Sequence, residues 1–203
     1  MPSLPVTETT RGRRLANRVS HDLATIHAIL DEGLVCHIGA VVRGRPWVQP
    51  TLHWRIGEEL FIHGHAGNGL YAALVEGAEA CATVTLLDGL VLARSAFHHS
   101  VNFRSVVVFG TVRAVTDPAE KNTALEAMMD KLAPGRWPDV RAPSPSELKA
   151  TAVLALPITE ASAKVRQGMP KDDAEDMAVP VWAGVVPLSL TRGEPVEDCT
   201  PTA

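Results

Sequence analysis

The segment from Val35 to Gly64 constrains the fold most strongly, because it alternates short apolar runs with turn signals. It reads VCHIGAVVRGRPWVQPTLHWRIGEELFIHG. Glycine turns at Arg43-Gly44-Arg45 and Ile56-Gly57-Glu58 divide it, and strands separated by such turns are typical of β-hairpins. The sequence therefore predicts a meander of three strands, at about 35–42, 46–54 and 59–64.

Further strands and helices extend this meander. A helix at about 69–76 precedes a strand near 80–86, and two more strands flank a polar insert within 86–115. Six strands with short connections predict an antiparallel sheet closed into a barrel. Three further helices are expected. The first spans about 20–34, the second begins at a capping Asp117 with Pro118 in its first turn, and a short third helix begins after Ser144. Later strands are expected at about 151–158, 161–166 and 181–188. The predicted fold class is mainly β with flanking helices.

The size and composition of the chain fit one soluble domain. It has 203 residues, of which 46% are hydrophobic, and it contains no apolar run long enough for a membrane helix. The first residues carry arginines without the apolar core of a secretory signal. We expect an N-terminal arm at 1–19, the folded domain at 20–188, a C-terminal tail at 189–203, and a cytoplasmic location.

Charge and cysteine content exclude other classes. The formal net charge of -4 argues against a nucleic-acid binder, and nothing predicts membrane binding. Arg11, Arg13 and Arg14 form either a solvated arm or one that reaches a subunit interface or an anionic ligand. Three cysteines without CxxC spacing predict neither a disulfide framework nor a zinc cluster.

The polar insert within Leu86–Val115 supplies the first candidate site. Two apolar runs enclose a group of polar side chains, and polar groups in such a setting need partners or a ligand. Arg104 and Ser105 suit an anionic or carbonyl-rich ligand, although Arg104 could instead pair with an acidic residue at a sheet end. The group is Ser95, His98, His99, Ser100, Asn102, Arg104 and Ser105.

The histidines and a glycine-rich turn supply the second candidate site. His63 and His65, with His98 and His99, could ligate a metal or haem, but their spacing favours histidines that line a pocket, so we predict no metal. The turn from His63 to Gly69 offers small residues and backbone N–H groups, which suit a phosphate or an ordinary strand-to-helix turn equally well. The sequence contains no GxSxG, P-loop or GxGxxG motif.

Taken in order, these segments resemble the FMN-binding split-barrel superfamily of pyridoxamine 5'-phosphate oxidase, in particular its nitroimidazole-reductase-like flavoproteins. The resemblance covers about Thr10 to Leu188. Its most specific pieces are LLDGLVLARSAFHHS at 86–100, NFRSVVVFG at 102–110, ASAKVR at 161–166 and VWAGV at 181–185.

The resemblance implies a six-stranded split β-barrel that forms a homodimer, with FMN bound in clefts at the interface. It implies that one strand lies along the flavin edge, that the turn after His63 faces the phosphate, and that His63 lies near the reactive face as the catalytic candidate. The implied cofactor-binding residues are Gln49, Pro50, Thr51, Leu52, His63, Gly64, His65, Asn68, Gly69, Ser100, Asn102, Arg104, Ser105 and Trp182.

One departure from the family pattern concerns the phosphate. Relatives usually carry Arg or Lys at about Gly69 or Leu70, whereas this chain has neither. We therefore expect Arg104 or an arginine of the arm to bind the phosphate. We expect an FMN-dependent oxidoreductase that acts on a small molecule, with a nicotinamide electron donor as a candidate partner. The alternative is a non-catalytic split barrel that binds haem or flavin as a sensor or store.

Overall fold

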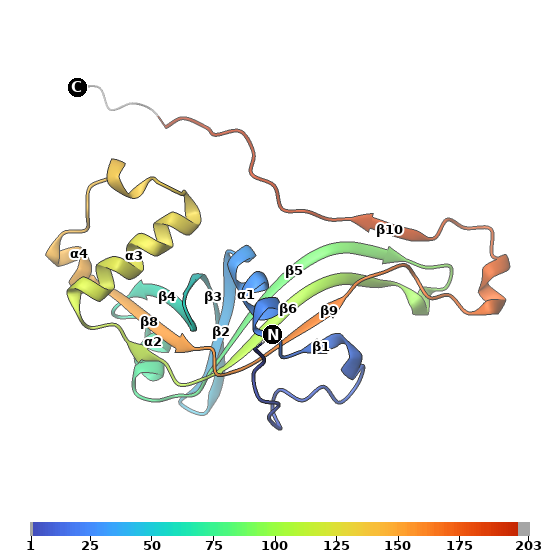
Figure 1. Cartoon of the computed structure of the whole chain (residues 1–203), viewed down its shortest axis with the longest axis horizontal. Helices are drawn as coiled ribbons and strands as arrows, with labels where there is room; N and C mark the ends of the chain where they lie inside the picture. The colour runs from blue at the N-terminus through green and yellow to red at the C-terminus, as the bar shows by residue number, and fades with distance from the viewer. Residues whose placement is uncertain (1, 199–203) are drawn as a thin grey trace. The chain divides into compact units, whose positions relative to one another are not determined.

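The computed structural model describes residues 2–198, which group into two compact units. The first unit comprises 2–86 and 103–166, and the second comprises 87–102 and 167–198. Both β5 and β6 run from one unit into the other, because each strand contains a boundary between the units (Figure 1).

An antiparallel sheet forms most of the first unit. The order of its strands is β1-β9-β6-β5-β2-β3-β4-β8-β7, and β10 pairs with the far end of β5. The strands are β1 (Val19–Ser20), β2 (Val35–Val42), β3 (Arg45–Ile56), β4 (Glu59–His65), β5 (Ala80–Leu92), β6 (Ser100–Gly110), β7 (Arg113–Ala114), β8 (Thr151–Pro157), β9 (Glu160–Arg166) and β10 (Gly184–Pro187).

Four α-helices flank this sheet, and each begins with a side-chain cap. Asp22, Asn68, Asp117 and Ser144 accept hydrogen bonds from backbone N–H groups of the first turns. Their bounds are α1 (Leu23–Glu32), α2 (Gly69–Val75), α3 (Pro118–Leu132) and α4 (Pro145–Ala150). Figure 1 shows α3 and α4 beside β8. None of the helices in residues 2–198 has the length and apolarity that crossing a bilayer requires.

The predicted class, mainly antiparallel β with flanking helices, is confirmed, but the six-stranded barrel is corrected. The sheet has ten strands, and its order runs from β1 to β7 without closing within the described residues. The two-residue strands β1 and β7 are too short to produce a periodic signal, and β8 and β9 continue the sheet rather than lying apart from it.

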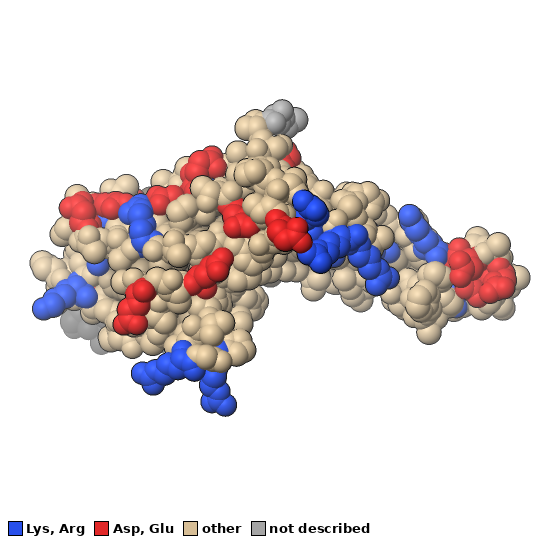
Figure 2. Space-filling view, turned by 90° about the horizontal axis from the view of Figure 1, so that it is seen from below, with Lys and Arg blue, Asp and Glu red and all other residues tan. Residues whose placement is uncertain are grey.

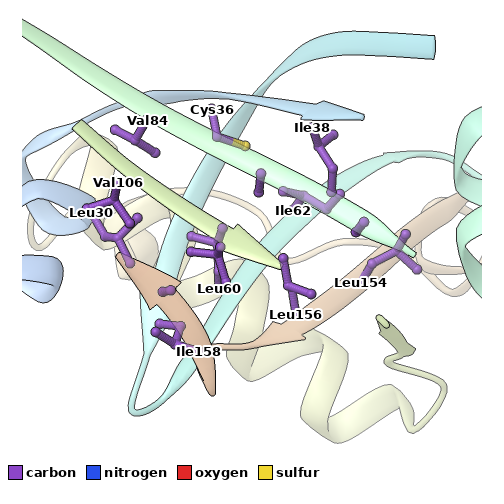
Figure 3. Packing of buried hydrophobic residues seen from close by; sticks show 14 of the residues in the cluster. Leu30, Cys36, Ile38, Leu60, Ile62, Val84, Val106, Leu154, Leu156 and Ile158 are labelled. Atoms are coloured by element: carbon purple, nitrogen blue, oxygen red, sulfur yellow. The ribbon is translucent and has the colours of Figure 1, made fainter. Parts of the chain in front are cut away.

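The main core fills the inner face of the sheet. Cys36 and Ile38 from β2, Leu60 and Ile62 from β4, and Leu154 from β8 pack together there (Figure 3). A second cluster, which includes Trp54, Phe61 and Val153, packs against α3 and α4 on the opposite face. Burial of this apolar surface is the main stabilising contribution to the unit.

A buried polar contact joins α1, β3 and α3. The carbonyl oxygen of Leu30, in the last turn of α1, lies 3.0 Å from His53 Nε2 and accepts a hydrogen bond from Lys131 Nζ at 2.9 Å. Burial, followed by the nearby Lys131 charge, lowers the pKa of His53 to about 4. Burial also lowers the pKa of Lys131 to about 8. His53 is therefore neutral at physiological pH and can donate from Nε2 to the helix end.

Candidate functional site

The central feature of the candidate site is an open backbone edge on β3. Residues 45–52 of β3 pair with β2, but β4 pairs only with residues 53–56. The N–H of His53 donates to the Leu34 carbonyl on the β2 side, so alternation directs the N–H groups of Val48 and Leu52 to the other side. Between 45 and 52 that side has no strand partner within the described residues.

Two prolines mark the same edge. Pro46 and Pro50 share the alternation of Val48, so their ring nitrogens face the open side, where no ladder hydrogen bond is lost. The open edge therefore offers the N–H groups of Val48 and Leu52 together with carbonyl oxygens. Such groups need a ligand, water or another chain to satisfy them.

The turn between β4 and α2 lies next to this edge. Asn68 caps α2, because its Oδ1 accepts from the N–H of Leu70 at 2.9 Å and from the N–H of Tyr71 at 3.4 Å. Its Nδ2 donates to Gln49 Oε1 on β3 at 3.0 Å. A single side chain therefore both starts the helix and fixes it to the open strand.

Backbone donors of the turn are largely satisfied within the chain. The N–H of Gly67 donates to His65 Nδ1 at 3.0 Å, and the N–H of Asn68 donates to the His65 carbonyl. Together with the Asn68 cap, these bonds occupy most of the N–H groups from Gly67 to Tyr71. A phosphate at this turn therefore needs charge from elsewhere.

His63 lies on β4 directly beside this network. Its carbonyl accepts from the Tyr71 hydroxyl at 2.8 Å, and the Thr51 hydroxyl lies 3.4 Å from the same oxygen. The ring is half-buried, its centroid lies 5.8 Å from that of Trp54, and its Nδ1 is buried without a hydrogen-bond partner. Burial lowers the pKa of His63, which favours the neutral ring.

A cavity of about 920 Å³ lies between the β2–β3 hairpin and α2. Gly69 forms part of its wall, where an added Cβ would lie 3.9 Å from Trp47. Its lining is Val41, Val42, Arg43, Arg45, Pro46, Trp47, Gly69, Ala72, Ala73, Glu76 and Ala78. The volume falls in the usual range for small-molecule and cofactor pockets.

The structure thus brings together the sequence-predicted residues of β3, β4 and the α2 turn. These are Gln49, Pro50, Thr51, Leu52, His63, Gly64, His65, Asn68 and Gly69. Arg104 and Ser105 lie on β6, which is separated from β3 by β5 and β2 in the sheet. The guanidinium group of Arg104 makes two hydrogen bonds to Glu32, at 2.5 and 2.8 Å, and Ser105 Oγ lies 3.5 Å from the Lys164 carbonyl.

The remaining predicted residues belong to the second unit. Ser100 is exposed, Trp182 is 62% exposed, and the buried Asn102 donates to the Gly168 carbonyl at 3.1 Å. His98 Nε2 lies 3.1 Å from Asp173 Oδ2. His98, Asp173 and Asp176 hold their ligand atoms within 4.8 Å of one another, a set that the sequence spacing did not reveal.

Arg43, Arg45 and Trp47 are the cavity residues that sequence reasoning missed. All three flank a turn signal, and the sequence was interpreted there only as a hairpin connection. The available signal was an aromatic residue between two prolines that mark an edge strand, because an aromatic side chain beside an edge strand suits a ligand.

Comparison with known protein families matches residues 22–165 to the model described as pyridoxamine 5'-phosphate oxidase. The match begins at the cap of α1 and ends in β9, so it includes β3, β4 and α2. No curated protein sequence matches the chain.

Solved structures extend the comparison. The flavocytochrome Anf3 from Azotobacter vinelandii is 42% identical, with a TM-score of 0.91 over 97% of this chain and 91% of that chain. An FAD and heme binding protein from Mycobacterium smegmatis is 39% identical, with a TM-score of 0.85 over 89% of each chain. A putative 5-nitroimidazole antibiotic resistance protein from Bacteroides thetaiotaomicron is 24% identical, with a TM-score of 0.61 over 72% of this chain and 86% of that chain, and shares the fold.

Proposed function

Because this chain belongs to the pyridoxamine 5'-phosphate oxidase family, we propose that it binds a flavin nucleotide and acts as an oxidoreductase on a small molecule. The flavin is FMN according to the family resemblance, and FAD is named for a relative that is 39% identical. The flavin, when bound, supplies the hydride or electron transfer, and the protein supplies binding, orientation and exclusion of water.

The open edge of β3 is the observation that carries this proposal. A flavin ring has hydrogen-bonding groups along one edge and apolar faces. The N–H groups of Val48 and Leu52 and the neighbouring carbonyls provide a row of fixed donors and acceptors at strand spacing. Trp47, which is 47% exposed, adds an aromatic surface beside them. These residues fit a planar heterocycle.

In this proposal His63 acts from β4. Its lowered pKa favours the neutral ring, so a ring nitrogen is available to accept a proton, and the ring is cationic only while it holds that proton. The bonds of Thr51 and Tyr71 to its carbonyl fix the backbone from which the ring extends. His63 would thus orient the substrate and exchange a proton with it.

The partner assignments are part of the same proposal. The outward face of the β2–β3 pair exposes Val35, Val41 and Val48 where water would favour polar residues, which supports a homodimer with cofactor at the interface. A second copy could then bring Ser100, Asn102, Arg104, Ser105 or Trp182 to the cofactor. The net charge of -4 and the interspersed basic and acidic side chains in Figure 2 favour small-molecule ligands, including a nicotinamide donor, over nucleic acid.

Haem binding is a second candidate, because one similar structure is named for both FAD and heme and another is a flavocytochrome. Two histidines offer a ligand nitrogen. His63 has a buried Nδ1 without a partner. His99 Nδ1 lies 2.9 Å from the Ser95 carbonyl, and donation there would leave Nε2 as the lone-pair nitrogen, as in many metal-bound histidines.

Absorption spectroscopy tests both candidates on the purified full chain. We expect flavin bands, either as isolated or after addition of FMN or FAD, with tight binding seen as a shift of the bands. Colourless protein that shows no binding of either flavin would contradict the proposal. A Soret band after haem addition would support the second candidate. Its loss in His63→Ala, but not in a His98→Ala, His99→Ala double variant, would locate the ligand on β4.

A further inference from the structure

The cavity between the β2–β3 hairpin and α2 carries positive charge that the chain itself does not neutralise. Arg43 and Arg45 both line it, and in the part of the chain that the structure describes neither guanidinium group has an ion pair or hydrogen bond. Arg113, by contrast, contacts Glu59 and Glu120 at 2.8 and 2.7 Å. Glu76 is the acidic residue of the lining, so two cations face one carboxylate.

The backbone at Arg43 is unusual for an arginine. Arg43 and Gly44 have φ values of +53° and +75°, which is a two-residue turn with both residues in the left-handed region. Such turns favour Asn, Asp or Gly at the first position, and another residue there costs on the order of 1 kcal/mol. The turn alone does not account for arginine at this position, whereas a role for its side chain would.

The opposite wall of the cavity provides space but no cation. Gly69 has no side chain, and α2 presents Ala72 and Ala73. The Asn68 side chain already accepts from the N–H groups of Leu70 and Tyr71, so these backbone amides contribute little to an anion there. The charge for a phosphate therefore comes from the hairpin wall.

We propose that Arg43 and Arg45 bind the phosphate or pyrophosphate of a nucleotide cofactor in this cavity, with Trp47 against its planar part. This inference rests on the proposed flavin site and replaces the family's cation at Gly69 or Leu70 with two arginines from the other wall. Arginine suits this role because its planar group binds phosphate oxygens in pairs. The phosphate belongs either to the flavin nucleotide or to a nicotinamide dinucleotide.

Equilibrium binding to an Arg43→Gln, Arg45→Gln double variant tests the inference. Riboflavin, FMN and FAD are titrated by quenching of flavin fluorescence, and NADPH is titrated against the flavin-loaded protein. Arg141→Gln is the matched control, because Arg141 is also exposed but pairs with Glu147 outside the cavity. Arg104→Gln tests the competing assignment on β6.

If the flavin phosphate occupies the cavity, the double variant binds FMN and FAD at least tenfold more weakly, while riboflavin affinity and the control are unchanged. If the phosphate belongs to the nicotinamide donor, only NADPH affinity falls, by at least tenfold. Unchanged affinity for all nucleotides, or a selective loss in Arg104→Gln alone, overturns the inference and leaves flavin binding intact. Wild-type protein that binds neither flavin nor NADPH overturns both this inference and the proposed function.

Discussion

At the scale of single residues, His53 shows how burial creates a pH dependence. Its ring is fully buried, and its pKa is lowered to about 4 from a usual value of 6.5. Between these two values the unfolded chain binds a proton that the folded chain does not. The free energy of unfolding therefore falls as pH decreases from about 6.5 to about 4.

We expect this loss to be on the order of 3 kcal/mol, since each pKa unit corresponds to about 1.4 kcal/mol. Urea unfolding at a series of pH values measures it. In His53→Gln, which retains a donor for the Leu30 carbonyl, the slope between pH 6.5 and 5 should be shallower. His27→Asn, at a partly exposed histidine, serves as the control. Parallel curves for wild type and His53→Gln would show that His53 does not cause the slope.

Individual residues were predictable where a local sequence pattern indicated their role. Asp117 and Ser144 cap helices as their spacing indicated. The approach of Asp173 to His98 was not predictable, because 75 residues separate them. The role of Arg43 and Arg45 was not predictable from the sequence. The glycine between them indicates a turn, but a turn signal does not indicate what the neighbouring side chains contact.

At the scale of elements, Asn68 is the residue on which the position of α2 depends. Its Oδ1 accepts hydrogen bonds from the N–H groups of Leu70 and Tyr71, and its Nδ2 donates a hydrogen bond to Gln49 Oε1. We expect Asn68→Ala to lower the free energy of unfolding by about 1–2 kcal/mol, because a helix cap and a tertiary hydrogen bond are lost together.

Asn68→Asp is the matched variant, since a carboxylate restores the cap acceptor. Chemical denaturation should therefore place its stability near that of wild type, with only the Gln49 contact altered. Equal destabilisation by Ala and Asp would mean that the bond to Gln49, not the cap, fixes the helix.

The existence and order of elements followed from periodicity, whereas their ends depended on pairing. The meander was predicted at 35–42, 46–54 and 59–64 and is observed as Val35–Val42, Arg45–Ile56 and Glu59–His65. β5 continues to Leu92 rather than ending near 86, because its far half pairs with β10. β3 pairs with β4 only from His53 to Ile56. No local sequence signal marks the point N-terminal to His53 where this pairing stops, since side chains continue to alternate along both strands.

At the scale of the whole molecule, the outward face of β2 and β3 bears on whether the chain forms a dimer. Val35, Val41 and Val48 are 48%, 64% and 63% exposed, on the side opposite Cys36 and Ile38. A sheet face that meets water usually alternates to polar residues, so these valines favour a second copy as partner.

Sedimentation analysis checks this expectation. The wild-type chain should sediment as a dimer, and Val48→Asp should shift it to monomer, because the substitution places a charge within an apolar contact. Leu190→Asp, at a residue that is 90% exposed in the C-terminal segment, should leave the dimer unchanged. A monomeric wild type, or a Val48→Asp protein that remains dimeric, would exclude this face as the interface.

Assembly and long-range arrangement lie beyond what local patterns predict. The sequence predicts one domain at 20–188, and this division stays a prediction. Contacts group the described chain into two units that share β5 and β6. Hydrophobic periodicity identifies which face of a strand is apolar, but it does not determine which distant strand or which copy covers that face.

The open edge of β3 also bears on how the unloaded chain behaves in solution. An unpaired strand edge is a template on which other chains can add strands, and this leads to aggregation. Pro46 and Pro50 interrupt the row of donors along the edge, which weakens such pairing without closing the edge to a small ligand. If the proposed cofactor binds at this edge, its supply also affects the solubility of the protein.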